Sequence, residues 1–240
     1  MKYIFATFLL SILCAIGLQA QEESSPPKFY LGAAYGTSFP IGNFKDADIA
    51  NPDAGFAKNG RRIDAYGGYF LDEFEKMTLT AVFRYQTFET GVEDIVSSFR
   101  EDNPGIEISA STGDWQVYSL LLGVAYRMPI GSRIALFPRV GVGPMLATNP
   151  GIMVTIPMAI NGNNFERSSE RGLGLGYEIG LGLKRNLGKH FALMPTFTFS
   201  GGFVSIKDVV TTIDNVASTS DSQQTIQSFN VGLSLAYQFY

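Results

Sequence analysis

The sequence has very little of the residue types on which many active sites depend. Its 240 residues include one cysteine, Cys14, and one histidine, His190. Zinc sites are built from clusters of cysteine and histidine, and most nucleophilic catalysis needs a histidine close to the nucleophile. We therefore expect no metal site and no cofactor.

Charged residues are also scarce, and the net charge of the chain does not favour a polyanionic partner. The formal net charge is −4, and the isoelectric point is about 5.1, so nucleic acid is not an expected partner. Charged residues make up 17% of the chain, below the roughly 25% of an ordinary soluble domain. Aromatic residues reach 13% and glycine numbers 26, which indicates a chain rich in β formers and poor in solvated surface.

The N-terminal segment has the pattern of an export signal. Lys2 precedes an apolar run, and small residues precede Gln21, so residues 1–20 are predicted to be a cleaved signal peptide. Cys14 as a lipidated residue is a weaker alternative, because it lies inside the apolar run after a bulky leucine. We assign 21–27 to a short periplasmic segment and 28–240 to a single domain. No later run is a continuous apolar helix, so a membrane form must be a closed barrel.

Apolar and small or polar residues alternate along the remaining chain, as they do in β-strands. The last run places bulky residues on one face and serine, asparagine, glycine and glutamine on the other. Residues 172–184 place leucine on one face and mostly glycine on the other, which excludes a stable helix. About eight such runs occur: 28–38, 62–71, 76–88, 115–127, 133–147, 172–184, 190–203 and 228–240.

The connections between these runs are of two kinds. Short turns at 72–75, 128–132 and 186–189 alternate with long polar segments at 39–60, 89–114, 148–171 and 204–225. This asymmetry is typical of transmembrane barrels, with short turns on the periplasmic side. We predict an all-β, eight-stranded, antiparallel up-and-down transmembrane β-barrel with four long extracellular loops.

The bulky face is predicted to face lipid. A soluble, lipocalin-like, lipid-binding barrel would point it inward, but the opposite face carries too little charge to serve as a solvated surface. Tyr118 and Tyr126 bracket an apolar stretch, as aromatic residues at a membrane interface do. Pro138, Pro144 and Pro195 fall in the outward phase, where we expect bulges or broken pairing.

With these features, the chain resembles the small outer-membrane β-barrel family of Gram-negative bacteria, the OmpA-type and OmpX-type eight-stranded barrels. Segment 39–60 is similar to first loops of that family. The last strand resembles its assembly signal, through Val231, Leu233, Leu235, Tyr237 and Phe239. The resemblance implies an outer-membrane location, the lipid bilayer and the barrel-assembly machinery as partners, and a monomer. Tyr240 departs from the pattern, which leaves open a terminal register shifted by one residue.

One group of inward residues carries charge. Asp64, Arg84, Arg139 and Glu178 are predicted near mid-height, paired as Asp64 with Arg84 and Arg139 with Glu178. Charges persist in such an interior only when paired or hydrated. We expect an ion-pair plug, with a gated ion path as the alternative, and the remaining space filled by Tyr30, Tyr66, Gln86, Phe137 and Met145.

The family resemblance does not specify an activity, because members include adhesins, structural anchors and small channels. We expect a non-enzymatic barrel with a structural or surface-interaction role, whose long loops contact an extracellular ligand. The alternative is a narrow passive channel or carrier for small hydrophilic solutes or ions. His190 lies beside a short turn, far from the outer leaflet, so catalysis there is not expected.

Overall fold

The computed structural model describes residues 27–48, 51, 53–72, 76–102, 108–130, 134–155, 164–213 and 216–240. The predicted signal peptide at 1–20 and nearly all of the predicted periplasmic segment lie outside these residues. None of the helical segments in the described part of the chain has the length and apolarity needed to cross a membrane.

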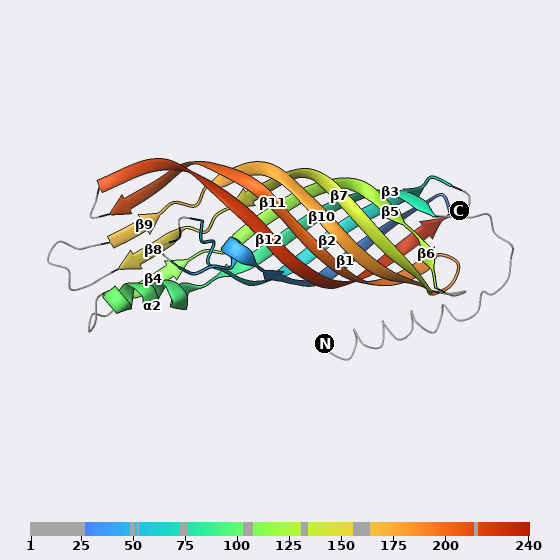
Figure 1. The fold of residues 1–240 in the computed structure, drawn as a ribbon, viewed down its shortest axis with the longest axis horizontal. Helices are drawn as coiled ribbons and strands as arrows, with labels where there is room; N and C mark the ends of the chain where they lie inside the picture. The colour runs from blue at the N-terminus through green and yellow to red at the C-terminus, as the bar shows by residue number, and fades with distance from the viewer. Residues whose placement is uncertain are drawn as a thin grey trace, which may run out of the picture.

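Eight long strands among the described residues form a closed antiparallel ring (Figure 1). Each strand pairs with the next long strand along the chain, and the last pairs with the first from Phe29 opposite Phe239 to Pro40 opposite Ser228. The two-residue strand β6 (Met128–Pro129) adds to the edge of β7. The eight strands are β1 (Phe29–Pro40), β2 (Ala57–Phe70), β3 (Met77–Thr90), β5 (Trp115–Tyr126), β7 (Ile134–Thr148), β10 (Arg171–Asn186), β11 (Phe191–Ile213) and β12 (Val216–Phe239).

The two faces of the barrel are as the alternation predicts. On β5, Leu120 and Leu122 are exposed on the outside, whereas Leu121 and Ala125 are buried inside. The same arrangement holds on the other long strands, so the bulky face is outside and the lipocalin-like alternative is excluded. The second strand begins five residues before its predicted start, at Ala57.

Inward glycines allow neighbouring strands to approach closely. Gly123 and Gly141 are register partners on β5 and β7. A Cβ atom on Gly123 would lie 2.0 Å from the carbonyl oxygen of Val140, a distance that no side chain tolerates. A Cβ atom on Gly141 would meet nothing closer than 3.5 Å. Of the two, Gly123 is therefore the one that the backbone geometry requires.

The three prolines interrupt pairing without shifting register. Pairs between β5 and β7 are missing beside Pro138 and Pro144, and pairs between β10 and β11 are missing beside Pro195. The register before and after each gap is the same, so the strands contain no bulge there. A proline lacks the N–H that a ladder bond requires, which explains the gaps. The predicted broken pairing is confirmed.

The register of the last strand places Phe239 on the outer face, in phase with the other bulky residues of that strand. Tyr237 and Phe239 lie on the outer face, whereas Gln238 is buried in the lumen. Tyr240 follows the end of β12, donates a hydrogen bond to the carbonyl of Lys189 and packs under the Lys189 ammonium. The additional residue therefore closes against the short turn before β11 and does not move the register.

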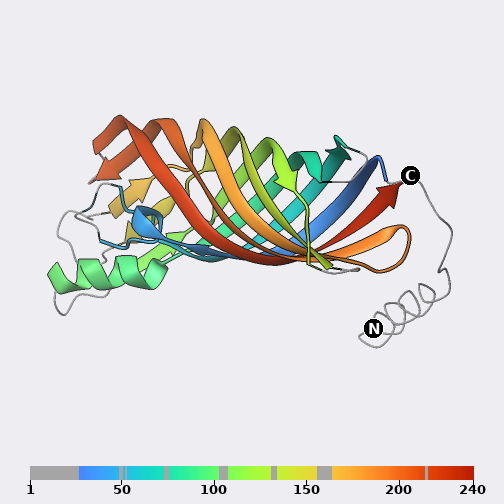
Figure 2. The same cartoon turned by 45° about the vertical axis from the view of Figure 1, so that its right-hand side comes forward.

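The long connections contain regular structure at the end of the barrel opposite the short turns (Figure 2). Segment 204–225, where the sequence predicts a loop, is instead mostly strand, because β11 and β12 continue together beyond the ring. Its serine and threonine residues look like a loop in sequence, but they pair across the two arms. The other connections contain η2 (Gly42–Phe44), α2 (Val92–Asp102), β4 (Ser109–Thr112), β8 (Ile152–Thr155) and β9 (Asn164–Arg167).

Candidate functional site in the lumen and at the long-loop end

Arg84 lies at the centre of a buried charge network inside the barrel. Its Nε donates to Oδ1 of Asp64 at 2.8 Å, and its Nη2 donates to Oδ2 at 3.0 Å. The same Nη2 contacts the carboxylate of Glu178 across the lumen. Asp64 and Arg84 are register partners on β2 and β3, as the sequence predicts, whereas the contact between β3 and β10 crosses the barrel.

Arg139 completes the predicted group, with Nε 2.6 Å from Oε1 of Glu178. The structure thus brings all four predicted residues together, but as one network and not as two separate pairs. Glu178 forms ion pairs with two arginines, Arg84 and Arg139. The cross-lumen contact depends on how the sheet curls, and neighbouring-strand arguments do not predict it.

Arg62 also belongs to this network, although it is not among the lumenal charges that we predict from the sequence. Its side chain is fully buried, with Nη1 2.8 Å from Oγ1 of Thr198 and Nη2 3.0 Å from Oγ1 of Thr196. Its Nε lies 3.4 Å from Oδ2 of Asp64. Arg62 is two residues from Asp64, so it shares the inward face, and that spacing was the available signal. The network therefore contains three arginines and two carboxylates.

A layer of amide and hydroxyl groups lies directly above the charges. Gln86 donates to Oγ of Ser38 and to Oδ1 of Asn230, both at 2.9 Å. Asn230 in turn donates to Oγ of Ser200 at 2.9 Å. These bonds join β1, β3, β11 and β12 across the lumen.

An apolar plug closes the lumen at the long-loop end. Phe44, from η2, is completely buried and packs edge-on against Phe88 and Trp115. The indole Nε1 of Trp115 donates to the carbonyl of Gly55 at 2.8 Å, which fixes the first long connection over the barrel mouth. The buried cluster at this level comprises Phe44, Ala57, Phe88, Trp115, Val117, Met145, Ala147, Val204, Ile206, Val209 and Ile226.

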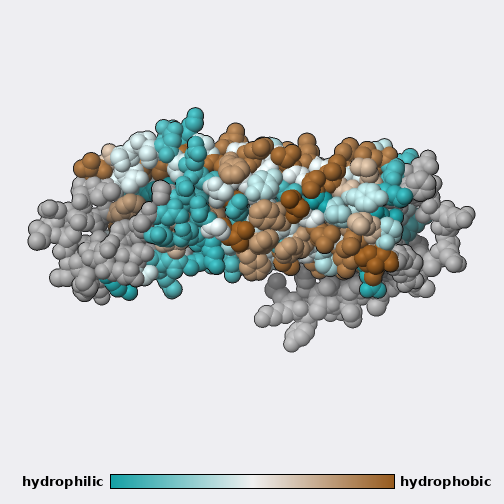
Figure 3. All heavy atoms as spheres, viewed as in Figure 1, coloured by the Kyte–Doolittle hydropathy of each residue, from teal (hydrophilic) through white to brown (hydrophobic). Residues whose placement is uncertain are grey.

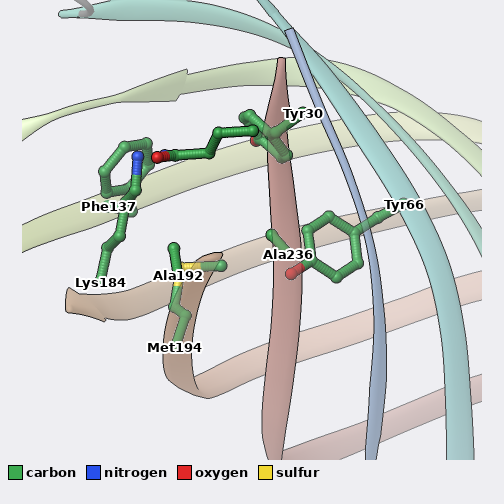
Figure 4. A pocket seen from close by; sticks show the side chains of 8 residues that line it. Tyr30, Tyr66, Phe137, Lys184, Ala192, Met194 and Ala236 are labelled. Carbon is green, nitrogen blue, oxygen red and sulfur yellow. The ribbon is translucent and has the colours of Figure 1, made fainter. Parts of the chain in front are cut away.

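Aromatic side chains fill the opposite, short-turn end (Figure 4). Tyr30 packs against Tyr66 and Phe70, and the Lys184 ammonium lies over the ring of Phe137 at 5.3 Å from its centroid. The cavity that remains among them measures about 20 Å³, which is room for about one water molecule. In the described residues, the lumen thus has charges at mid-height and apolar layers on both sides of them.

The outer wall carries an apolar band with a polar border (Figure 3). On β11, Phe197 and Phe203 face outward and are exposed, and the next outward positions are Ser205 and Lys207. The inward positions of this strand change from polar to apolar along the same direction, from Thr198 and Ser200 to Val204 and Ile206. The level between 203 and 205 therefore marks where the strand leaves its apolar surroundings.

Beyond this border the chain builds a small extracellular platform, which we define as α2, β4, β8, β9 and the paired extensions of β11 and β12. β4, β8, β9 and β11 are joined in that order by antiparallel pairing. Ile108, Ile152 and Val154 form a buried core that Val96 of α2 helps to cover. Here apolar residues are inside, as they are in any soluble domain.

His190 lies at the short-turn rim, where the sequence predicts it. Its ring stacks on Tyr237 with centroids 5.2 Å apart, and its Nδ1 lies 3.2 Å from the carbonyl oxygen of Gln238. Within the described residues, no group of three or more histidine, cysteine or acidic side chains is placed to hold a metal ion.

Solved structures of outer-membrane proteins are similar to this chain. A major outer membrane protein from Thermus thermophilus shares 15% identity with a TM-score of 0.52, covering 88% of this chain and 99% of its own. Ail, the attachment invasion locus protein of Yersinia pestis, shares 15% identity with a TM-score of 0.45, covering 89% and 99%. Neisserial surface protein A shares 13% with a TM-score of 0.44, covering 88% and 97%. At these identities the likeness concerns the fold alone.

A search of curated proteins finds no match to the chain. A family model described as "Outer membrane protein beta-barrel domain" matches residues 6–239. Together with the closed ring of eight strands, the lipid-facing apolar band and the short and long connections, this match shows that the chain belongs to the outer membrane protein β-barrel family and resides in the outer membrane.

Proposed function

We propose that this protein is a non-enzymatic outer-membrane barrel that acts through its extracellular platform by contacting an external partner. The observation that carries the proposal is the division of the molecule into a lumen crossed by polar networks and apolar layers and a folded platform. Hydrogen bonds and ion pairs cross the barrel at mid-height, and apolar layers lie above and below them. The platform has a core of its own, which a set of unstructured connections would not need.

Two further observations support the non-enzymatic part of the proposal. His190 lies at the rim opposite the platform, with its ring held between Tyr237 and Tyr240. The buried carboxylates, Asp64 and Glu178, are both engaged by arginines and enclosed. A general base needs access to its substrate, which these groups lack.

The alternative, a narrow passive channel, draws on the charged lumen. An ion path would have to pass the Arg84 network and the plug around Phe44. Planar-bilayer recordings on the refolded barrel and on Arg139→Ala test it. We expect no steady conductance from either protein, and a conductance in the unmodified barrel would favour the channel.

Cysteine labelling of intact cells tests the platform and the lumen together. Cys14 lies in the predicted signal peptide, so a single thiol introduced into the barrel reports one position. We expect a membrane-impermeant maleimide to label Ser220→Cys, on the exposed extension of β12, and not Ser119→Cys, buried in the lumen. Failure to label Ser220→Cys would contradict the surface location, and equal labelling of both positions would show an open lumen.

A further inference from the structure

On β2, β3 and β5 the apolar outer wall ends at one row of register partners; Tyr35 of β1 lies in the same row, and β1 carries one further exposed aromatic residue, Phe39, beyond it. In this row Tyr85 and Tyr118 stack with ring centroids 4.8 Å apart. Polar residues occupy the next outward row toward the platform. The apolar row is Tyr35, Ile63, Tyr85 and Tyr118, and the polar row is Thr37, Arg61, Thr87 and Gln116. Tyrosines at such a border are typical of the membrane interface.

A pocket of about 410 Å³ opens on the outer wall at this border. Its lining includes Tyr35 below, Arg61 beside it, and Glu89 and Asp114 above. The register of β2 and β3 shifts between Ala57 and Gly60, so that two residues of β2 oppose one residue of β3. A bulge of this kind re-aims side chains, and it lies at the edge of the pocket.

Arg61, Glu89 and Asp114 are the charged residues in the lining of this pocket. No carboxylate in the described residues forms an ion pair with Arg61, and Lys58 on the same strand is paired with Asp94. Extending the β3–β5 register by one pair beyond Phe88 and Trp115 places Glu89 opposite Asp114. Like charges directly opposite each other on neighbouring strands are destabilising. This juxtaposition favours a ligand that brings positive charge to the carboxylates and negative charge to Arg61.

The pocket lies at the depth of lipid headgroups. Arg61 is two residues from Ile63, which is about 7 Å along the strand. The headgroup layer on each side of the hydrocarbon core is roughly 5–8 Å thick. A molecule with acyl chains on the apolar wall would therefore carry its headgroup into this pocket.

We propose that the pocket binds the phosphate of an outer-leaflet glycolipid together with the divalent cation that accompanies it. Arg61 donates to the phosphate, because the guanidinium fork matches its oxygens. Glu89 and Asp114 bind the cation, since Mg²⁺ is commonly held by one or two carboxylates plus phosphate oxygens. Two carboxylates alone do not make a metal site, so the cation and the lipid bind together. This inference rests on the position of the pocket in the membrane and not on the proposed surface interaction.

Native mass spectrometry of the refolded full chain in detergent, titrated with diphosphoryl lipid A, tests the proposal. With millimolar Mg²⁺, we expect Arg61→Ala to weaken lipid binding about 10-fold or more, because a hydrogen bond to a charged group is lost. Arg185→Ala is the matched control, because Arg185 is also exposed and outward-facing but lies at the opposite rim. We expect it to bind as the unmodified protein does. Equal affinities for the unmodified protein and Arg61→Ala would overturn the proposal.

The double variant Glu89→Gln with Asp114→Asn gives a sharper test, because its effect on lipid affinity depends on the cation. With Mg²⁺ it binds lipid A more weakly than the unmodified protein. In EDTA it binds as well or better, because the carboxylates then only repel the phosphate. The same affinity ratio in both solutions would contradict the cation bridge.

Inorganic phosphate distinguishes a lipid site from a site for a soluble anion. We expect it not to displace lipid A at equal concentration, because it lacks the acyl chains that lie on the apolar wall. Displacement with the same potency would contradict the lipid assignment. The heat-modifiability gel of each variant shows that the barrel has folded before it is titrated.

Discussion

The barrel and the extracellular platform follow opposite rules of burial, although they share strands. Within the barrel, β12 points Asn230 and Ser234 inward and Val231 and Leu233 outward. Closer to the platform, in the apolar plug, the same strand buries Ile226 and exposes Thr225 and Gln227 only partly, and in the platform β8 buries Ile152 and Val154. Side-chain alternation is unchanged along the strand, so the difference comes from the surroundings. Lipid accepts apolar side chains on the outside, and water does not.

This comparison also shows what stabilises each region. The platform uses ordinary apolar burial. At mid-height the barrel lumen instead contains arginines, carboxylates and amide and hydroxyl side chains, which are held by hydrogen bonds and ion pairs. A charged interior of this kind tolerates the loss of a partner poorly.

The largest expected effect comes from breaking the lumenal network. Glu178→Ala leaves Arg139 and part of Arg84 buried without a counter-charge, and we expect it to lower the free energy of unfolding by about 3–5 kcal/mol. Urea unfolding in lipid vesicles measures the change. Glu93→Ala, at an exposed position of α2, is the control and is expected to unfold as the unmodified protein does. Equal stability of both variants would mean that the network contributes little.

The border on the outer wall predicts that an arginine introduced on β5 destabilises the protein more below the border than above it. Leu122→Arg places a charge in the middle of the lipid-facing band and should lower the free energy of unfolding by about 2–4 kcal/mol, whereas Gln116→Arg, above the border, should change it by about 0–1 kcal/mol. Both residues are exposed and share the outer face of β5. Unfolding titrations of the two variants in the same vesicles measure the difference. Similar losses of unfolding free energy in the two variants would mean that Gln116 also lies inside the lipid-facing band.

The close approach of β5 and β7 predicts a smaller contrast between two glycines. Gly123→Ala should lower the free energy of unfolding by about 1–3 kcal/mol, because its Cβ would overlap the Val140 carbonyl. Gly141→Ala, its register partner, has the space for a methyl group and should be close to neutral. The shift in urea midpoint checks both, and a larger cost at Gly141 would contradict the stated geometry.

The smallest effect concerns pH at the long-loop end. A hydrogen bond from the Asn51 side chain holds the pKa of Asp46 below its ordinary value. Because the pKa of Asp46 is lowered in the folded state, the contact stabilises the fold at pH values above the ordinary pKa of aspartate. This stabilisation is lost as the pH falls through the lowered pKa. We expect Asn51→Ala to raise the pKa of Asp46, as measured by NMR titration of the side-chain carboxyl. An unchanged pKa of Asp46 in this variant would show that the Asn51 side chain does not lower it.

Much of the barrel follows from sequence alone. Alternation along 228–239 predicts the terminal strand and its faces, because a strand turns each successive side chain to the opposite side. The same rule places Asp64 and Arg84 on neighbouring inward positions. Arg62 obeys it too, so alternation was sufficient to include it. The paired arms at 204–225 were missed for another reason, because short polar residues there resemble a loop until a partner strand is known.

The sequence determined the strands, their two faces, the lipid-facing side and the candidates for lumenal charge, because these depend on local alternation and composition. Only the tertiary structure decided that Arg84 reaches Glu178 across the lumen, that Phe44 closes the mouth and that Glu89 and Asp114 line one pocket with Arg61. Each of these depends on register, curvature or the return of a connection over the barrel. Such relations join residues far apart in the chain, and no local pattern records them.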